Sequence, residues 1–168
     1  AERGQRARFN EIAFQPLLVK ILVIGRARLD SDVLGAAGEL LDRGGVRVTS
    51  LRDDPRGLSV ACAPSTCLFT WEEAGMLRTA RVGADGAVND FDGAPVVPTA
   101  GAESEPAVSW DGTSFVLVSR LRDGAGVLAR RVDPATGASS APVVIGTWGV
   151  PSMPSVACAT GACVASYV

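Results

Sequence analysis

The 168-residue sequence contains no histidine and a single tyrosine, and Lys20 is its only lysine. Histidine is the commonest general base and the commonest metal ligand, so its absence removes the simplest catalytic and metal-binding arrangements. Serine is frequent, but a serine nucleophile would here need a rarer base than histidine. The composition therefore favours a protein that is not an enzyme.

The sequence also lacks an excess of basic over acidic residues and a long apolar run. The formal net charge is −2, which argues against a nucleic-acid partner. The longest apolar run, residues 16–25, is interrupted by Lys20 and is too short to span a bilayer. A signal-peptide core is an alternative for this run, but no Ala-x-Ala cleavage site follows it, and its β-branched residues favour a buried strand.

What the sequence does contain is a repeat of 48 residues. Val60, Val108 and Val156 stand at equivalent positions, each 48 residues from the next. In the middle copy, residues 106–118 place an Asp-Gly turn between two β-favouring segments, which predicts two strands joined by a tight turn. A fixed period of this length indicates a repeat architecture.

An aromatic pair in the middle copy is replaced by cysteines in the outer two. The aligned pairs are Trp110 with Phe115, Cys62 with Cys67, and Cys158 with Cys163. Residues flanking a four-residue hairpin loop face each other across two strands, within reach of a disulfide, so we predict one disulfide in each outer hairpin. Reduced core thiols and zinc are the alternatives, and the spacing within each pair differs from that of a zinc ribbon. Paired cysteines favour an oxidising compartment.

The segment Pro-Ala-Val-Ser-Trp-Asp-Gly-Thr-Ser-Phe-Val-Leu-Val at residues 106–118 resembles the repeat of large secreted bacterial β-propeller proteins. That repeat has the form Pro-x-Val-Ala-Trp-Asp-Gly-x-x-Tyr-Leu-Val-x-Trp and continues into a hairpin with an Arg-Val-Asp-x-x-Gly turn. Similar turns occur at residues 80–86 and 130–137. The resemblance covers residues 57–168 well and residues 24–32 weakly. It implies a propeller fold and secretion or display at the cell surface, and no particular activity.

We therefore expect an all-β protein built from antiparallel four-stranded blades of a β-propeller, arranged as a partial ring. The expected divisions are a poorly ordered or short helical N-terminus at 1–15, a partial blade at 16–56, blades at 57–104 and 105–152, and the first half of a further blade at 153–168. Complete rings have about four to eight blades. Further blades of a longer chain, or association of several copies, would complete the ring.

Two loops are candidates for ligand binding. Trp148 lies in a glycine-rich loop and is a candidate contact for a glycan or a protein, with packing against its own blade as the alternative. Asp90 and Asp92 partly match a calcium loop, although no glutamate closes it, and a solvated turn is the alternative. Tyr167 aligns with Trp71, so we expect it to pack rather than serve as a sialidase-type nucleophile.

These observations favour a non-enzymatic secreted or cell-surface module that binds a glycan or a protein. No cofactor and no membrane-spanning segment are expected. A fragment of an extracellular hydrolase and a structural spacer in a larger surface protein are the alternatives.

Overall fold

The computed structural model describes residues 12–13, 17–20, 29–35, 46–50, 55–96, 102–124, 126–147 and 153–168. The first three of these ranges are described by their backbone alone. The described residues form β-strands and no helix, which confirms the all-β expectation for this part of the chain. None of these segments is a helix that could cross a membrane.

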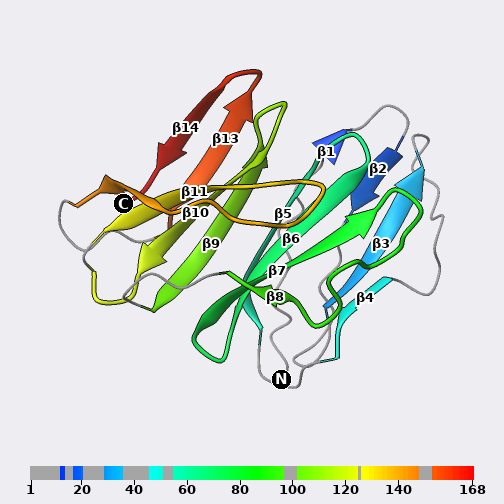
Figure 1. The fold of residues 1–168 in the computed structure, drawn as a ribbon, viewed down its shortest axis with the longest axis horizontal. Helices are drawn as coiled ribbons and strands as arrows, with labels where there is room; N and C mark the ends of the chain where they lie inside the picture. Colours follow the sequence, from blue (N-terminus) through cyan, green and yellow to red (C-terminus); the bar gives the residue numbers. More distant parts are fainter. Residues whose placement is uncertain are drawn as a thin grey trace, which may run out of the picture.

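The strands form three four-stranded antiparallel sheets and one hairpin, and each sheet keeps the order of the chain. In Figure 1 these units follow one another across the molecule, with the C-terminal hairpin at one side. The strands are β1 (Ile12–Ala13), β2 (Leu17–Lys20), β3 (Leu29–Gly35) and β4 (Val46–Thr49); β5 (Arg56–Cys62), β6 (Thr66–Glu73), β7 (Met76–Gly83) and β8 (Ala94–Pro95); β9 (Glu103–Trp110), β10 (Phe115–Leu121), β11 (Val127–Val132) and β12 (Val143–Gly146); and β13 (Ser155–Ala159) with β14 (Ala162–Ser166).

The register of the hairpins reproduces the 48-residue spacing. The directly opposed pairs next to the three turns are Cys62 with Cys67, Trp110 with Phe115, and Cys158 with Cys163. A positive φ recurs near the start of each repeat, at 61° in Gly57, 52° in Glu105 and 50° in Met153. In the first two repeats the strand register shifts beside this residue, as in a β-bulge. The sequence repeat is therefore a repeat of structural units.

The first strands of successive repeats are in contact, because β9 contacts β5 on one side and β13 on the other. In both neighbouring pairs, a backbone amide of the later strand donates to a serine hydroxyl of the earlier strand. The amide of Val108 donates to Ser59 Oγ at 3.1 Å, and the amide of Cys158 donates to Ser109 Oγ at 3.0 Å. Three strands from distant parts of the sequence thus lie side by side.

An apolar core fills the space between the sheet of β5–β8 and the sheet of β9–β12. We call it the inter-sheet core; it contains Ala61, Ala63, Leu68, Leu77 and Val96 from the first of these sheets and Val108, Phe115, Leu117 and Val132 from the second. Burying each large side chain is worth about 1.5–3 kcal/mol. These contacts hold the two repeats together face to face.

The expected partial blade at residues 16–56 lies only partly within the described residues and stays a prediction. The described residues between 12 and 49 form strands in the order β1-β2-β3-β4, and residues 12–13 are the described part of the predicted N-terminal segment 1–15. Val48 of β4 is fully buried and belongs to a second core with Phe69 and Trp71. The described residues do not close a ring.

Candidate binding site

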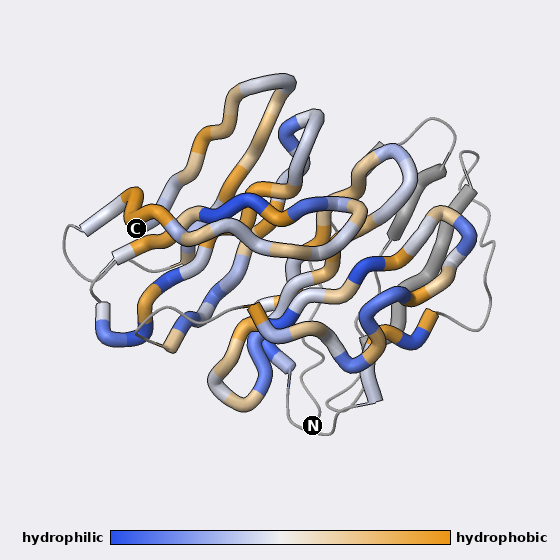
Figure 2. Tube along the Cα trace, in the orientation of Figure 1, coloured by the Kyte–Doolittle hydropathy of each residue, from blue (hydrophilic) through white to orange (hydrophobic). Residues whose placement is uncertain are grey.

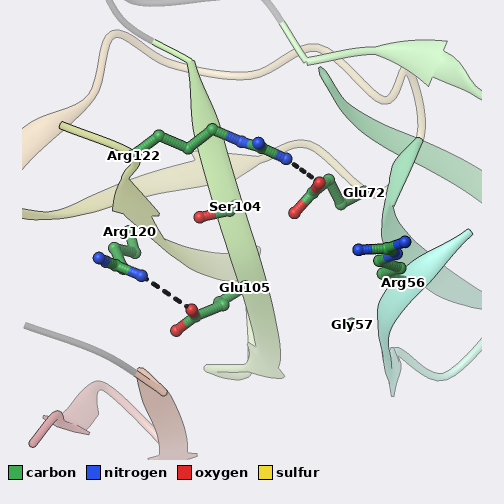
Figure 3. Close-up of a pocket in the computed structure, with 7 residues that line it drawn as sticks. All are labelled: Arg56, Gly57, Glu72, Ser104, Glu105, Arg120 and Arg122. Atoms are coloured by element: carbon green, nitrogen blue, oxygen red, sulfur yellow. Dashed lines mark hydrogen bonds and ion pairs between the residues drawn. The ribbon is translucent and has the colours of Figure 1, made fainter. Parts of the chain in front are cut away.

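A pocket of about 420 Å³ opens between the two central repeats. We call it the charged pocket, because most of its lining side chains are ionic. Figure 3 shows these residues, which are Arg56, Gly57, Glu72, Ser104, Glu105, Arg120 and Arg122. All come from the strand ends that lie away from the disulfide and aromatic turns, or from the loop after β10.

The repeat itself positions this pocket. Arg56 is paired with Glu72 across β5 and β6, and Ser104 is paired with Arg120 at the equivalent place across β9 and β10. The bulges beside these pairs bend the strands and turn side chains out of the ladder. Gly57 belongs to one bulge, and a Cβ there would approach Pro106 Cδ to 3.2 Å. The same strand ends therefore meet at the junction of two repeats.

Two ion pairs lie in the charged pocket. Arg120 Nη1 is 3.1 Å from Glu105 Oε1 within the second repeat. Arg122 reaches from the loop after β10 to Glu72 at the end of β6, and this pair connects the two repeats. The side chain of Arg122 is 46% exposed. Partly exposed ion pairs contribute about 0–1 kcal/mol each, so a ligand can replace one of them at low cost.

The charged pocket carries three arginines and two glutamates, so its lining is positive in a chain whose net charge is −2. A guanidinium presents a rigid fork of N–H donors that matches a carboxylate in a bidentate geometry. Ser104 adds a hydroxyl to the lining. This arrangement is suited to holding a carboxylate-bearing ligand.

The structure brings both predicted cysteine pairs together. Cys62 and Cys67 form one disulfide with their Cα atoms 3.9 Å apart, and Cys158 and Cys163 form the other at 4.0 Å. The amide of Ala63 donates to the Thr66 carbonyl, so the adjacent cysteine pair occupies a non-hydrogen-bonded position. Side chains are closest at such positions, which explains how the bridge fits the hairpin.

Asp90 and Asp92 bind different partners. Asp90 pairs with Arg81, whose Nε lies 2.6 Å from Asp90 Oδ2. Asp92 Oδ1 accepts a 2.6 Å hydrogen bond from the Ser50 amide and a 2.8 Å bond from the Ser50 hydroxyl. These bonds hold the pKa of Asp92 below its usual range. Asp92 therefore links the β7–β8 loop to the end of β4.

The described residues contain no group of three or more histidine, cysteine, aspartate or glutamate side chains that could hold a metal ion. Calcium at Asp90 and Asp92 stays a prediction. Trp148, the other loop candidate, lies outside the described residues.

Asp111 stabilises the turn between β9 and β10 through hydrogen bonds. Its Oδ1 accepts hydrogen bonds from the amides of Thr113 and Ser114, both at 2.8 Å, and from the Thr113 hydroxyl. Its Oδ2 pairs with Arg131. Burial alone would raise the pKa of Asp111, but these hydrogen bonds together hold it well below its usual range.

Sequence reasoning missed the charged pocket. A signal was present, because Glu72 and Arg120 occupy the same repeat position with opposite charges. The ion pair between Arg122 and Glu72 spans 50 residues and joins two repeats. It could not be anticipated without knowing that the sheets pack face to face.

A buried polar cluster was missed as well. Arg130 pairs with Glu103, and the Ser119 hydroxyl donates to the same carboxylate; all three residues are buried. The residues of the first repeat that are equivalent to Ser119 and Arg130 are Trp71 on the second strand and Ala80 on the third, as the strand pairing shows. The first repeat thus combines a large residue on its second strand with a small residue on its third. The second repeat reverses the two sizes.

No family model and no curated protein matches the chain. Among solved structures, the chain is similar to the crystal structure of TolB from Acinetobacter baumannii, with a TM-score of 0.49 and 14% sequence identity. The match covers 90% of this chain and 37% of that chain, so this chain spans well under half of that protein's length. A likeness of this size assigns no function.

Proposed function

We propose that the chain is a non-enzymatic β-propeller module, secreted or displayed at the cell surface, that binds a carboxylate on a protein or acidic glycan through the charged pocket. The observation that carries this proposal is the meeting of three arginines at the junction of two equivalent repeats. The disulfides support an oxidising compartment. The repeat of four-stranded antiparallel units supports membership of a propeller.

The ion pairs of the charged pocket support binding rather than turnover. Both glutamates of the charged pocket are already paired with arginines: Glu72 with Arg122, and Glu105 with Arg120. An incoming carboxylate can take over one guanidinium from its glutamate, and that exchange requires no chemical step. The side chain of Arg122 is half-exposed and is therefore accessible to a ligand.

The test measures the affinity of the full chain for an oligoglutamate peptide and for an oligogalacturonate, with oligoglutamine and a neutral glucan as uncharged counterparts. We expect binding to the acidic probes that weakens as salt is added, because exposed charges are screened. A hydrogen bond to a charged group is worth about 1.5–3 kcal/mol, so the double variant Arg120→Gln/Arg122→Gln should weaken binding about tenfold or more.

For the single variants Arg120→Gln and Arg122→Gln the matched control is Arg47→Gln, because it also removes one positive charge, from an exposed position on β4 outside the charged pocket. It should leave the affinity unchanged. A loss of affinity in Arg47→Gln equal to that in each single pocket variant would show a diffuse charge effect and overturn the pocket assignment. Hydrolysis of the glycan by the pure chain would favour the hydrolase alternative, and absence of binding to every probe would favour the spacer.

A further inference from the structure

The two glutamates of the charged pocket are held in different ways. Glu105 is bound from two sides, by Arg120 of its own repeat and by the backbone amide of Met153 at the start of the next one. Among the described residues, Arg122 is the sole hydrogen-bond partner of the Glu72 carboxylate. If a ligand takes over one arginine, Glu105 keeps a second donor, whereas Glu72 needs a new partner.

The two paired arginines differ as well. Arg120 is part of β10, and its side chain is 22% exposed. Arg122 lies in the loop directly after β10, and its side chain is twice as exposed, at 46%. Figure 2 shows hydrophilic chain both in this loop and at the end of β6, where Glu72 lies. Because side-chain atoms alone join Arg122 to Glu72, this pair can separate without breaking the pairing of the strands.

Glu72 has a second cation beside it. Its side chain is 14% exposed, and a carboxylate with so little contact with water needs a cation or a hydrogen-bond donor. Arg56 stands directly opposite Glu72 across β5 and β6 and lines the same pocket. Figure 3 shows the Glu72 side chain between Arg122 and Arg56. Glu72 can therefore pass from one arginine to the other and stay next to a positive charge.

The pairing of Arg122 with Glu72 is itself the binding of a carboxylate in the charged pocket. A ligand carboxylate would make the same kind of charge-assisted hydrogen bond to the Arg122 guanidinium. Two carboxylates at one guanidinium repel each other, since like charges a few ångströms apart raise the energy of the pair. Glu72 and a ligand therefore compete for Arg122.

We propose that Glu72 is an internal competitor that regulates the charged pocket. Glu72 occupies Arg122 in the chain without ligand, and an incoming carboxylate displaces it toward Arg56. This inference rests on the proposed function of the charged pocket and adds to it the residue that limits the affinity. Glu105 does not take this part, because Arg120 and the Met153 amide hold it in place.

The test measures the affinity of full-chain variants for the oligoglutamate peptide at fixed salt concentration. Glu72→Gln keeps the shape of the side chain and removes the competing charge. Binding should tighten about two- to fivefold, which corresponds to the worth of a partly exposed ion pair. Thermal unfolding of each variant checks that the fold is kept.

A double-mutant cycle separates competition for Arg122 from a general loss of negative charge. In an Arg122→Gln background, Glu72 has lost the cation for which it competes, so adding Glu72→Gln should leave the affinity unchanged. A gain from Glu72→Gln that is equally large with and without Arg122 would show charge repulsion alone and would overturn the proposal.

Glu105→Gln is the matched control, because it removes the same charge from the other glutamate of the same pocket. Its effect on the affinity should be equal in the parent and in the Arg122→Gln background. Coupling of Glu105 to Arg122 as strong as that of Glu72 would contradict the assignment of Glu72 as the competitor.

The part played by Arg56 has its own comparison. Arg56→Gln should weaken binding more in the parent than in Glu72→Gln, because the displaced Glu72 carboxylate needs Arg56 and the glutamine does not. Equal weakening in both backgrounds would overturn the transfer of Glu72 to Arg56.

Failure of this inference differs from failure of the proposed function. If neither the parent nor Glu72→Gln binds oligoglutamate, both are overturned. If the parent binds, Arg120→Gln/Arg122→Gln abolishes that binding and Glu72→Gln leaves it unchanged, the proposed function stands and the internal competitor is overturned.

Discussion

Trp110 and Phe115 face each other across β9 and β10 with ring centroids 5.0 Å apart and planes inclined by 59°. They occupy the register that the disulfides occupy in the neighbouring hairpins. Phe115 is fully buried in the inter-sheet core, and Trp110 packs against that core from a half-buried position. One hairpin is thus secured by aromatic packing where its equivalents use a covalent bond.

Phe115→Ala should lower the free energy of unfolding by about 3–5 kcal/mol, because it removes a fully buried ring from the core. Trp110→Ala should cost less, since its ring is half-buried. The double variant Trp110→Cys/Phe115→Cys should form a third disulfide in air. Urea unfolding and intact mass check these results, and a double variant that stays reduced would show that the three hairpins are not equivalent.

The cluster of Glu103, Ser119 and Arg130 should tolerate paired changes better than single ones. Arg130→Met leaves the buried Glu103 carboxylate without its cation, and loss of one member of a buried pair costs about 3–5 kcal/mol. Arg130→Met/Glu103→Gln removes both charges and should recover a large part of that loss. Denaturant midpoints of the three proteins measure the effect; equal stability of the single and double variants would contradict it.

The hairpins could be predicted from the sequence because their evidence is local. Cys62 and Cys67 are five residues apart, and the same spacing recurs in Trp110 with Phe115. Cross-strand geometry then leaves few choices for their pairing. The strands before residue 56 were harder to predict, because no complete copy of the motif lies there.

The charged pocket could not be predicted in the same way. Its residues come from strand ends where the repeats differ, with Arg56 replaced by Ser104 and Glu72 by Arg120. What they share is a position at the junction of two sheets, and that position depends on how the sheets pack. The local sequence pattern therefore predicts the repeating hairpin, whereas the candidate site depends on contacts between neighbouring repeats.

Asp111 should make stability dependent on pH in the acid range. Its pKa in the folded chain lies below the value of about 3.9 typical of an unfolded chain. Its stabilising contribution is therefore complete above about pH 4 and is lost as the pH falls toward the folded-state pKa. Asp111→Asn should be less stable than the parent at pH 7, with a difference that shrinks below about pH 4. A difference that stays constant across pH in thermal unfolding would contradict this assignment.

The positive φ shared by the three repeats predicts opposite effects at two equivalent positions. Gly57→Ala should destabilise, because alanine disfavours a φ of 61° and its Cβ would approach Pro106. Met153→Gly should be neutral or stabilising by up to about 1 kcal/mol, since glycine adopts a φ of 50° without strain and the Met153 side chain is 73% exposed. Melting temperatures of the two variants check this; destabilisation by Met153→Gly would show that the positive-φ positions of the repeats are not equivalent.

An NMR titration of the isotope-labelled full chain with the oligoglutamate peptide tests the functional account most directly. We predict saturable shifts that concentrate at the residues of the charged pocket, with Arg120, Arg122 and Ser104 among the largest, and that disappear in Arg120→Gln/Arg122→Gln while persisting in Arg47→Gln. Shifts that centre on another surface, or that are unchanged in the double arginine variant, would contradict the assignment of the charged pocket as the binding site.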